Sequence, residues 1–445
     1  MAAPPPGGTL LIATWGMPAQ WQNTTYELDG RSAEFCTTLP LLLERFGGAD
    51  VALLVLDSLV DEYTREGRES ACYRCYDQLR SLVREAGSAA SYGELREGVR
   101  RFVERYAACL VGEEAARGVR AVVAPAVGSP GGGWVFEGRA ADFEAVALYE
   151  LGLLCASRPY RRVVLDLSHG VNFMPALALR LAERLAGVLL TAHAELLGSG
   201  VELLVYNSDP VGSRPMRINQ IAGARIRSVP VLHELPRRLL RRRGYVGDER
   251  VEKVNRSYAE AALLAVSALY YPLPLALCYS REKASRSFEV LEQAFQLWLE
   301  HAAVEGRRVR RGLSLSPDGV YALLLSGSAA KRLESIGASY PADLEKLREL
   351  AELYRAVNES YYHLIASELG RVEEKLAEKG YPRHAPLHEV LGDPRGRGKP
   401  DKRVMIAHAG LQKELVEVVE RHKLKYIDDP ELLISDADLL VPTTD

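Results

Sequence analysis

The spacing of apolar and polar residues changes along the chain. In the first half, short apolar runs alternate with longer segments that repeat apolar residues at helical intervals, which is typical of a parallel sheet covered by helices on both faces. The predicted strands are residues 9–14, 51–57, 119–127, 162–167 and 201–206. The predicted helices are residues 32–46, 70–85, 92–110, 140–156 and 173–186, the last one stopping at Gly187. The pattern therefore predicts a Rossmann-like α/β half.

The second half has a different pattern. Residues 215–235 predict a hairpin that turns near Gly223, and a basic run follows at 236–244. From about residue 250 onward the apolar spacing is nearly all helical. The expected organisation is a Rossmann-like domain at 1–235, a helical linker at 236–280 and an all-α domain at 281–445.

Composition narrows the function classes. The chain has 445 residues, of which 47% are hydrophobic, so it can bury a large core. Its 56 basic and 59 acidic residues give a net charge of -3, so no protein-wide field attracts DNA or anionic lipid. Any contact with nucleic acid must therefore be local.

Two segments bear on location. The first eight residues lack the basic start and apolar stretch of a signal peptide. Residues 261–278 carry no charge, but Pro272 and Pro274 interrupt them. Two buried helices that meet at Tyr271–Pro272 are a better interpretation than a membrane span, so we expect no membrane.

The six cysteines lie mostly in apolar segments, without the loop-rich spacing of a secreted framework, which favours a reducing cytoplasm. Cys72 and Cys75 form one C-x-x-C, but a structural zinc site needs four ligands. We interpret the pair as one helical face and expect no metal.

Two loops at the carboxyl edge of the predicted sheet carry candidate ligand-binding residues, because ligands of open α/β sheets bind there. The first strand is followed by T-W-G-M-P-A-Q-W, which places Trp15, Gly16 and Trp21 at this edge. Their indoles are suited to stacking on nucleobases, or equally to plugging the end of the sheet.

The fourth strand ends in D-L-S-H-G-V-N-F-M-P, residues 166–175. Asn172 is expected as a helix N-cap and Pro175 in the first turn. Free backbone N–H groups at this helix start, with donors from Ser168 and His169 and a turn at Gly170, suit a phosphate-bearing ligand. The Gly-rich segment at 129–133 follows another strand and could form a flexible phosphate loop, but a surface turn is the preferred interpretation.

Two common nucleotide-binding motifs are absent from the sequence. No G-x-G-x-x-G follows the first strand, and no G-x-x-x-x-G-K-[ST] occurs anywhere in the chain. Hydride transfer with NAD and P-loop ATP hydrolysis therefore lose most of their support.

A last long helix is predicted from residue 403 to about 425, with His408 on its apolar stripe. Such a histidine is usually structural, but its small neighbours allow another helix to approach closely. Arg403 at the helix start can curl toward His408, or toward the same group of a symmetry-related subunit. The basic loop at 394–402 suits nucleic-acid phosphates, or is simply solvated.

An Arg and a His at one seam suffice for RNA cleavage without a metal. The 2'-hydroxyl is the nucleophile, His408 exchanges protons and Arg403 stabilises the charged phosphorane. The product would end in a 2',3'-cyclic phosphate, and DNA would not be cut.

These motifs resemble a known family. R-V-M-I-A-H, residues 403–408, resembles the R-x-x-x-x-H motif of HEPN ribonucleases, and residues 166–175 look like the ligand loop of CARF sensor domains. Together they resemble the Csx-type ancillary ribonucleases of type III CRISPR systems.

The resemblance implies an N-terminal CARF domain and a C-terminal HEPN domain in a homodimer or higher homo-oligomer. One cyclic oligoadenylate, with cyclic tetra-adenylate preferred over hexa-adenylate, would bind across the two-fold axis and activate a composite site for single-stranded RNA, with no other cofactor. The implied catalytic pair is Arg403 and His408; the implied sensor residues are Ser168, His169, Gly170 and Asn172, and less firmly Trp15, Gly16 and Trp21. Ser168 stands where threonine is frequent in the family, and Val404 where many relatives have asparagine.

Two alternatives remain open. The run R-R-L-L-R-R-R at 237–243 would suit a ligand-responsive DNA-binding regulator. In the second alternative the sensor domain cleaves its own cyclic ligand, in place of or in addition to RNA cleavage by the helical domain; the sequence offers no clear general acid or base for that reaction.

Overall fold

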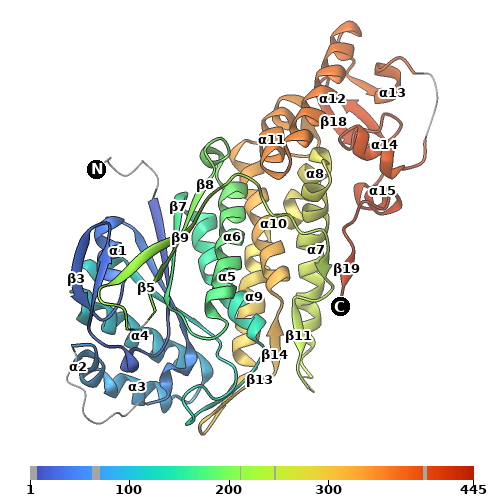
Figure 1. Cartoon of the computed structure of the whole chain (residues 1–445). Helices are drawn as coiled ribbons and strands as arrows, with labels where there is room; N and C mark the ends of the chain where they lie inside the picture. Colours follow the sequence, from blue (N-terminus) through green and yellow to red (C-terminus); the bar gives the residue numbers. More distant parts are fainter. Residues whose placement is uncertain (1–7, 63–70, 211, 245–246, 394–397) are drawn as a thin grey trace.

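The computed structural model describes residues 8–62, 71–210, 212–244, 247–393 and 398–445. Figure 1 shows a sheet with helices on both sides: one group lies to its left and below it, and a layer of long helices lies to its right and ends in a smaller lobe at the top. The start of the chain, and residues 394–397 of the predicted basic loop, lie outside the described residues.

An eight-stranded sheet organises the N-terminal half, in the order β3-β2-β9-β8-β7-β1-β4-β5. Its strands are β1 (Gly8–Trp15), β2 (Thr24–Leu28), β3 (Arg31–Phe35), β4 (Asp50–Leu56), β5 (Val119–Ala124), β7 (Tyr160–His169), β8 (Val201–Ser208) and β9 (Met216–Ile226). Strands β1, β4, β5, β7 and β8 run parallel, which confirms the mainly parallel sheet and all five predicted strands.

The predicted hairpin around Gly223 is wrong. Residues 216–226 form the single strand β9, which runs antiparallel to β8 and pairs Gly223 with Leu204. The glycine was interpreted as a turn, but β9 continues through it in extended conformation beside its neighbour. The predicted helix at 32–46 is also partly wrong, because β3 occupies its start and α1 (Leu39–Arg45) only its end.

The remaining helices of this half are α2 (Ala71–Gln78), α3 (Arg80–Gly87), α4 (Tyr92–Val111), α5 (Ala140–Ser157) and α6 (Met174–Ala192). The prediction that this last helix stops at Gly187 is wrong, because α6 continues to Ala192. A Cβ at this position would collide with the Tyr321 hydroxyl and with Pro230. Gly187 therefore permits close packing instead of ending the helix.

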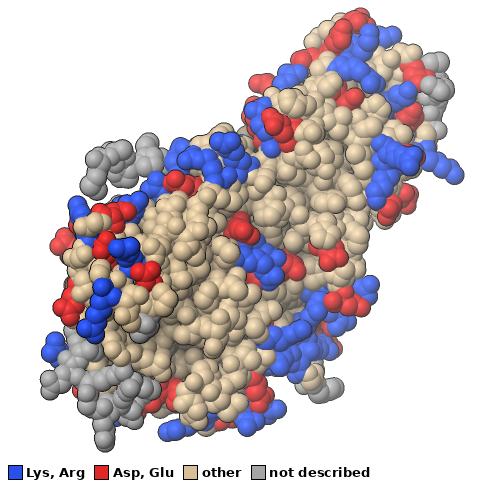
Figure 2. All heavy atoms as spheres, viewed as in Figure 1, with Lys and Arg blue, Asp and Glu red and all other residues tan. Residues whose placement is uncertain are grey.

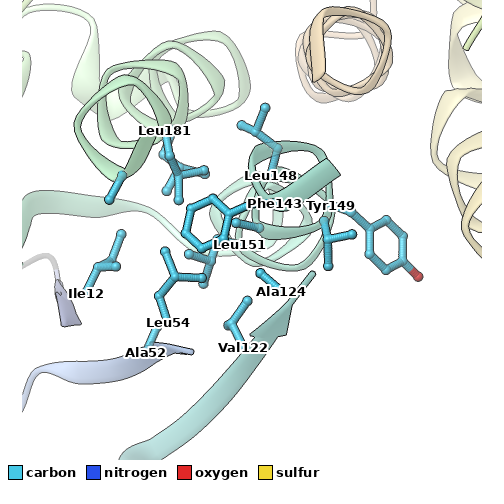
Figure 3. Close-up of a cluster of buried hydrophobic side chains, with 14 of the residues drawn as sticks. Ile12, Ala52, Leu54, Val122, Ala124, Phe143, Leu148, Tyr149, Leu151 and Leu181 are labelled. Atoms are coloured by element: carbon cyan, nitrogen blue, oxygen red, sulfur yellow. The ribbon is translucent and has the colours of Figure 1, made fainter. Parts of the chain in front are cut away.

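Helix α5 lies in the middle of the core, buried on almost all sides. Figure 3 shows Phe143 and Leu151 of α5 facing Ile12, Leu54 and other side chains of the sheet, while Tyr149 points the other way. Tyr149 stacks on Phe295 of the long-helix layer with ring centroids 4.0 Å apart. One hydrophobic core therefore runs from the sheet into the long helices.

The C-terminal half is mainly helical. Its helices are α7 (Glu249–Tyr270), α8 (Pro274–Ser285), α9 (Ser287–Glu300), α10 (Pro317–Ser335), α11 (Leu344–Val357), α12 (Glu359–Glu378), α13 (Leu387–Val390), α14 (Lys402–Ala407) and α15 (Pro430–Asp436). The predicted break at Tyr271–Pro272 is confirmed between α7 and α8. Within the described chain, no helix is both long enough and apolar enough to cross a membrane.

Short strands interrupt this helical half more often than the pattern predicted. They are β10 (Leu235–Pro236), β11 (Leu240–Arg242), β12 (Ala302–Glu305), β13 (Arg308–Arg311), β14 (Leu313–Leu315), β15 (Ala342–Asp343), β16 (His384–Pro386), β17 (Val416–Val419), β18 (Lys423–Tyr426) and β19 (Thr443–Thr444). Strand β13 pairs with β6 (Val135–Glu137), a short strand of the N-terminal half. Strands β15, β18, β17 and β16 form a small sheet in the far lobe.

The long C-terminal helix predicted from residue 403 to about 425 is wrong. Helix α14 ends at Ala407, and the chain then turns through Ala409 and Gly410, whose φ angles are 51° and 77°. The Gly410 amide closes the helix by donating to the Met405 carbonyl at 2.7 Å. Strands β17 and β18 follow in place of the predicted helix, because tertiary pairing overrides the helical spacing of the apolar positions.

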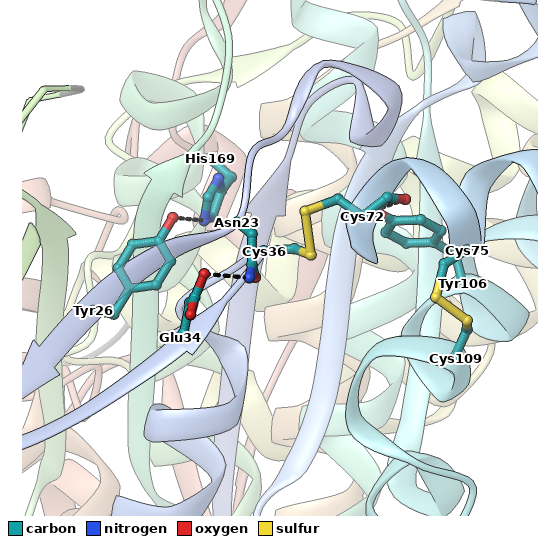
Figure 4. The surroundings of a disulfide bond; sticks show 9 residues. All are labelled: Asn23, Tyr26, Glu34, Cys36, Cys72, Cys75, Tyr106, Cys109 and His169. Atoms are coloured by element: carbon teal, nitrogen blue, oxygen red, sulfur yellow. Dashed lines mark hydrogen bonds between the residues drawn. A yellow bond between two sulfur atoms is a disulfide. The ribbon is translucent and has the colours of Figure 1, made fainter. Parts of the chain in front are cut away.

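The cysteines also differ from the expectation. Cys72 and Cys75 do share α2, but each is oxidised: Cys36 pairs with Cys72 and Cys75 pairs with Cys109 (Figure 4). Sequence separations of 36 and 34 residues hid both bonds, since only spatial proximity identifies the partners.

Candidate functional site

The ends of β1 and β7 meet at the carboxyl edge of the sheet. Trp15 pairs in register with His169, and the Gly16 amide donates to the His169 carbonyl at 2.8 Å. A Cβ at Gly16 would come within 2.6 Å of the Val171 side chain. The two loops singled out from the sequence are therefore in direct contact, as the parallel arrangement predicts.

The two tryptophans at this edge have different roles. Trp15 is fully buried, and its ring lies 5.0 Å from that of Trp21 in an edge-on arrangement. Trp21 is half-buried and lies 4.6 Å, centroid to centroid, from His169. Trp15 thus plugs the edge, whereas Trp21 remains available to a ligand.

Two cavities open at this edge. The larger cavity, of about 570 Å³, is lined by Trp21, Ser168 and His169 together with the end of β8 and Arg214. The smaller cavity, of about 290 Å³, is lined by Trp15, Gly16 and Asn172 together with Ser58, Leu59 and Asp61. Gln20 lines both, so the cavities are neighbours.

Of the predicted sensor residues, only Gly170 lines neither cavity. A Cβ at this position would come within 2.6 Å of the Thr14 hydroxyl and 2.9 Å of the Pro175 ring. Gly170 therefore allows the loop to pack tightly.

Asp166 fixes the position of Ser168, which lines the larger cavity, although sequence reasoning did not single Asp166 out. This fully buried carboxylate accepts hydrogen bonds from the Ser168 hydroxyl at 2.6 Å, the Ser168 amide at 3.0 Å and the Thr38 hydroxyl at 2.5 Å. Because the Ser168 proton is committed to Asp166, the serine oxygen can only accept a hydrogen bond from a ligand.

His169 is a neutral group in this site. Burial lowers its pKa from the usual value, against the opposing effect of the Asp166 carboxylate. Its Nε2 lies 3.5 Å from the Tyr26 hydroxyl, whose pKa burial raises to about 12 (Figure 4). Arg214 lines the same cavity, has no partner within the described ranges, and can supply positive charge to an anionic ligand.

Asn172 is not the N-cap of α6, contrary to the prediction. Phe173 occupies the cap position, Met174 starts the helix, and Pro175 lies in the first turn as expected. Asn172 has a φ of 53°, in the left-handed region that asparagine tolerates better than most residues. Its exposed side chain is therefore free to face the smaller cavity.

The Gly-rich segment at 129–133 holds a carboxylate of the protein itself. The Gly133 amide donates to Asp61 at 3.0 Å, and a Cβ on Gly131 or Gly133 would collide with that side chain. The segment therefore forms a wall beside the smaller cavity and is not an open phosphate loop.

A buried ion pair links this edge to the helical half. Arg311 on β13 contacts Asp57 at the end of β4, and neither side chain is exposed to solvent. Asp57 also accepts from the Tyr92 hydroxyl at 2.7 Å and from the Ala126 amide at 2.8 Å. Asp57 immediately precedes Ser58 and Leu59 of the smaller cavity, so the helical half holds one of the cavity walls.

Arg403 and His408 lie at opposite ends of the short helix α14. Asp401 caps this helix by accepting from the Val404 amide at 2.9 Å, and the fully buried Met405 anchors it to the lobe. Arg403 is exposed and has no ion-pair partner in the part of the chain described. Figure 2 shows basic side chains gathered where Figure 1 places α14.

His408 was expected on a buried stripe, but its side chain is 36% exposed. Its Nδ1 lies 3.1 Å from Oε2 of Glu368 on α12 and makes no aligned hydrogen bond. Glu368 was missed at the sequence level, because nothing in the local pattern of α12 distinguishes it from the other glutamates of that helix.

Two further expectations concern metals and DNA. Among the residues that the structure describes, no cluster of His, Cys, Asp and Glu is suited to hold a metal ion. The basic run at 237–243 contains β11, which pairs with β14, and Arg242 lies 3.4 Å from Glu252. This run is therefore not a helix of the kind that enters a DNA groove.

Comparison with known families finds one matching segment in each half of the chain. The CARF-domain model of the CRISPR system endoribonuclease Csx1 matches residues 10–210, which include the carboxyl edge, and the HEPN-domain model of the same family matches residues 358–428, which include Glu368, Arg403 and His408. The chain belongs to the CARF–HEPN family of CRISPR-associated ribonucleases. Its CARF segment lines the smaller cavity and most of the larger one, and its HEPN segment contains the Arg–His pair.

One curated relative is also a member of this family. The CRISPR system endoribonuclease Csx1 of Methanocaldococcus jannaschii is 27% identical over 217 residues, which are 48% of this chain and 39% of the relative. The match thus spans about two fifths of the relative's length.

Proposed function

We propose that this CARF–HEPN chain is an endoribonuclease of type III CRISPR antiviral defence, activated by a cyclic oligoadenylate and specific for single-stranded RNA. The observation that carries the proposal is the position of Arg403 and His408 in the HEPN segment. Both side chains reach solvent on one short helix, far along the chain from the two cavities of the CARF segment. Sensing and cleavage are therefore assigned to separate sites.

The chemistry follows from the two side chains. The RNA 2'-hydroxyl attacks the adjacent phosphorus, and the 5'-oxygen leaves with the electron pair of the broken bond. His408 exchanges the protons, and the Arg403 guanidinium stabilises the charge on the phosphorane. The products are a 2',3'-cyclic phosphate and a 5'-hydroxyl, and the reaction needs neither a metal ion nor a cofactor.

A homodimer or higher homo-oligomer would complete the site. One protomer supplies one guanidinium and one imidazole, and a two-fold axis close to α14 would bring two pairs to one cleft. Arg403 has no acceptor among the described residues of its own protomer, which supports the proposal that RNA or a second protomer binds beside it.

The activator we propose is cyclic tetra-adenylate, with hexa-adenylate as the alternative. Ser168, His169 and Trp21 line the larger cavity, whereas Trp15, Gly16 and Asn172 line the smaller one. A stacking face, neutral hydrogen-bonding groups and Arg214 suit the bases and phosphates of such a ring. The ring has its own two-fold symmetry, so it can bind across a dimer axis.

Domain limits and location complete the proposal. We retain a sensor domain at 1–235, a helical connection at 236–280 and a ribonuclease domain at 281–445, in a cytoplasmic protein. The two disulfides are compatible with that location in organisms whose intracellular proteins are disulfide-rich, such as hyperthermophiles.

The test mixes the purified protein with labelled single-stranded RNA and EDTA, with and without cyclic tetra-adenylate or hexa-adenylate. We expect activator-dependent cutting in EDTA, products ending in a 2',3'-cyclic phosphate, and no cutting of DNA of the same sequence. His408→Ala should bind the activator normally and cut no RNA. Cutting by His408→Ala at the parent rate would overturn the assignment.

A further inference from the structure

The imidazole of His408 is held from one side by a neighbouring helix. Its Nδ1 is buried and lies 3.1 Å from Oε2 of Glu368, while 36% of the histidine side chain is exposed. Because Nδ1 is buried, the exposed part of the ring lies elsewhere, and Nε2 has no partner in the described part of the chain. The two ring nitrogens are thus in different environments.

Building on the proposed ribonuclease function, we propose that Glu368 is a positioning residue for His408. A carboxylate beside Nδ1 favours the tautomer in which Nδ1 carries the proton. Nε2 then keeps its lone pair and can accept the proton of the 2'-hydroxyl. Glu368 touches neither RNA nor the reacting atoms in this scheme, and it acts only through the imidazole.

The surroundings of Glu368 are those of a fixed group. Its side chain is 13% exposed, against 44% for Arg371, whose Nη1 lies 3.7 Å from the same oxygen, Oε2. The helix that carries it, α12, is capped by Asn358, which accepts from the Ser360 amide at 3.0 Å. A carboxylate on a long, capped helix can fix the position of a residue at the end of a six-residue helix.

The contact between Glu368 and His408 is not yet an aligned hydrogen bond, although the distance is short enough. Catalytic hydrogen bonds are often poorly aligned in free enzymes and become aligned when substrate binds. A small rotation of the imidazole would bring Nδ1–H into line with Oε2. We expect that rotation when RNA or the second protomer contacts His408.

The test compares two chemically identical changes on one helix. Glu368→Gln removes the charge beside His408, whereas Glu373→Gln removes the charge of a glutamate that pairs with Arg348 at 2.6 Å. For Glu368→Gln we expect kcat to fall about 10- to 100-fold, a part of the roughly 10²- to 10⁴-fold that general acid–base catalysis supplies. KM for RNA and the affinity for cyclic tetra-adenylate should change less than about twofold. Glu373→Gln should match the parent.

A second variant guards against a simple folding defect. Glu368→Asp keeps the charge on a shorter side chain and should recover part of the lost kcat, with a melting temperature like that of Glu368→Gln. Equal kcat values for Glu368→Gln, Glu373→Gln and the parent would overturn the role of Glu368, as would no recovery in Glu368→Asp. Loss of cutting in His408→Ala, with full cutting in Glu368→Gln, would reject this inference and leave the proposed ribonuclease intact.

Discussion

The carboxyl edge of the CARF segment and helix α14 of the HEPN segment are built in opposite ways. At the carboxyl edge, the Ser168 hydroxyl and the Asp166 carboxylate bond each other, Trp15 is fully buried, and a disulfide fixes Cys36 in the cavity wall. At α14, Arg403 is exposed and has no ion-pair partner among the described residues, and Nδ1 of His408 lacks an aligned hydrogen bond. The edge is preorganised within one chain, whereas α14 leaves the Arg403 guanidinium and Nε2 of His408 for another molecule to contact.

This contrast predicts where changes act. Substitutions that disturb the carboxyl edge should lower the stability of the fold, because its groups support one another inside the core. Substitutions at α14 should leave stability almost unchanged and affect only cleavage. The four predictions below test the contrast in order of decreasing effect on stability.

The largest effect is expected from the buried ion pair behind the smaller cavity. Arg311→Met leaves Asp57 as an uncompensated buried charge, which costs about 3–5 kcal/mol of unfolding free energy. Urea denaturation of the parent and the variant measures this loss. Adding Asp57→Asn to this variant should recover part of the lost unfolding free energy. A loss below about 1 kcal/mol in Arg311→Met would show that the ion pair does not stabilise the segment that lines the smaller cavity.

The disulfides should come next. Removing the Cys75–Cys109 bond with serine at both positions frees a loop whose ends are 34 residues apart, which costs about 3–4 kcal/mol in the chain-entropy account. The same change at Cys36 and Cys72 should cost about as much and also weaken activator binding, because Cys36 lines the larger cavity.

Reductant is the control for the disulfide prediction. It should lower the melting temperature of the parent and have no effect on a variant that lacks all four of these cysteines. Unchanged activator affinity in the Cys36/Cys72 variant would show that this disulfide does not contribute to activator binding in the larger cavity.

A pH effect of intermediate size should come from His169. Its pKa in the folded protein lies below the usual 6.5, so the unfolded chain binds protons more readily just below that pH. Stability therefore falls as the pH drops below about 6.5, by at most about 1.4 kcal/mol per pH unit, and is independent of this group well above it. Thermal melts from pH 8 to pH 5 should fall less steeply for His169→Gln, and identical slopes would contradict the neutral histidine.

The smallest effect on stability should accompany one of the largest effects on activity. Arg403→Ala removes an exposed side chain for which the described part of the chain supplies no ion-pair partner, so unfolding free energy should stay within about 0.5 kcal/mol of the parent. RNA cleavage should nevertheless fall by at least about 100-fold, because the phosphorane loses its cationic partner. Arg120→Ala, at an exposed arginine on β5, is the matched control and should keep the parent activity.

Much of the sheet was predictable because buried parallel strands give continuous apolar runs. All five predicted strands are present, and the loops after β1 and β7 meet as expected. The pairing of Cys36 with Cys72 was not predictable, because it depends on a hairpin of β2 and β3 that the pattern assigned to a loop and a helix. Asp166 also escaped notice, since its role appears only when Thr38 is brought beside it.

The C-terminal segment was the least predictable. Apolar residues at 404, 411, 415 and 418 have helical spacing, yet only the first of them lies in α14. Ala409 and Gly410 take left-handed conformations that end the helix, and Val418 lies in β17, which pairs with β18. Arg403 and His408 could nevertheless be singled out as candidates, because their motif depends on residue type and spacing and not on a long helix; their catalytic role is a proposal. Glu368 could not be found in this way, since its contact crosses between helices.

The central position of α5 has a practical consequence for dissecting this molecule. Tyr149 stacks on Phe295, and Gly152 is packed so closely against Leu324 that even a methyl group would not fit. A fragment ending at residue 235 would therefore expose the hydrophobic surface that α9 and α10 cover in the intact chain, and it should aggregate when expressed alone. Sensor and nuclease are better separated by point substitution in the intact chain than by truncation.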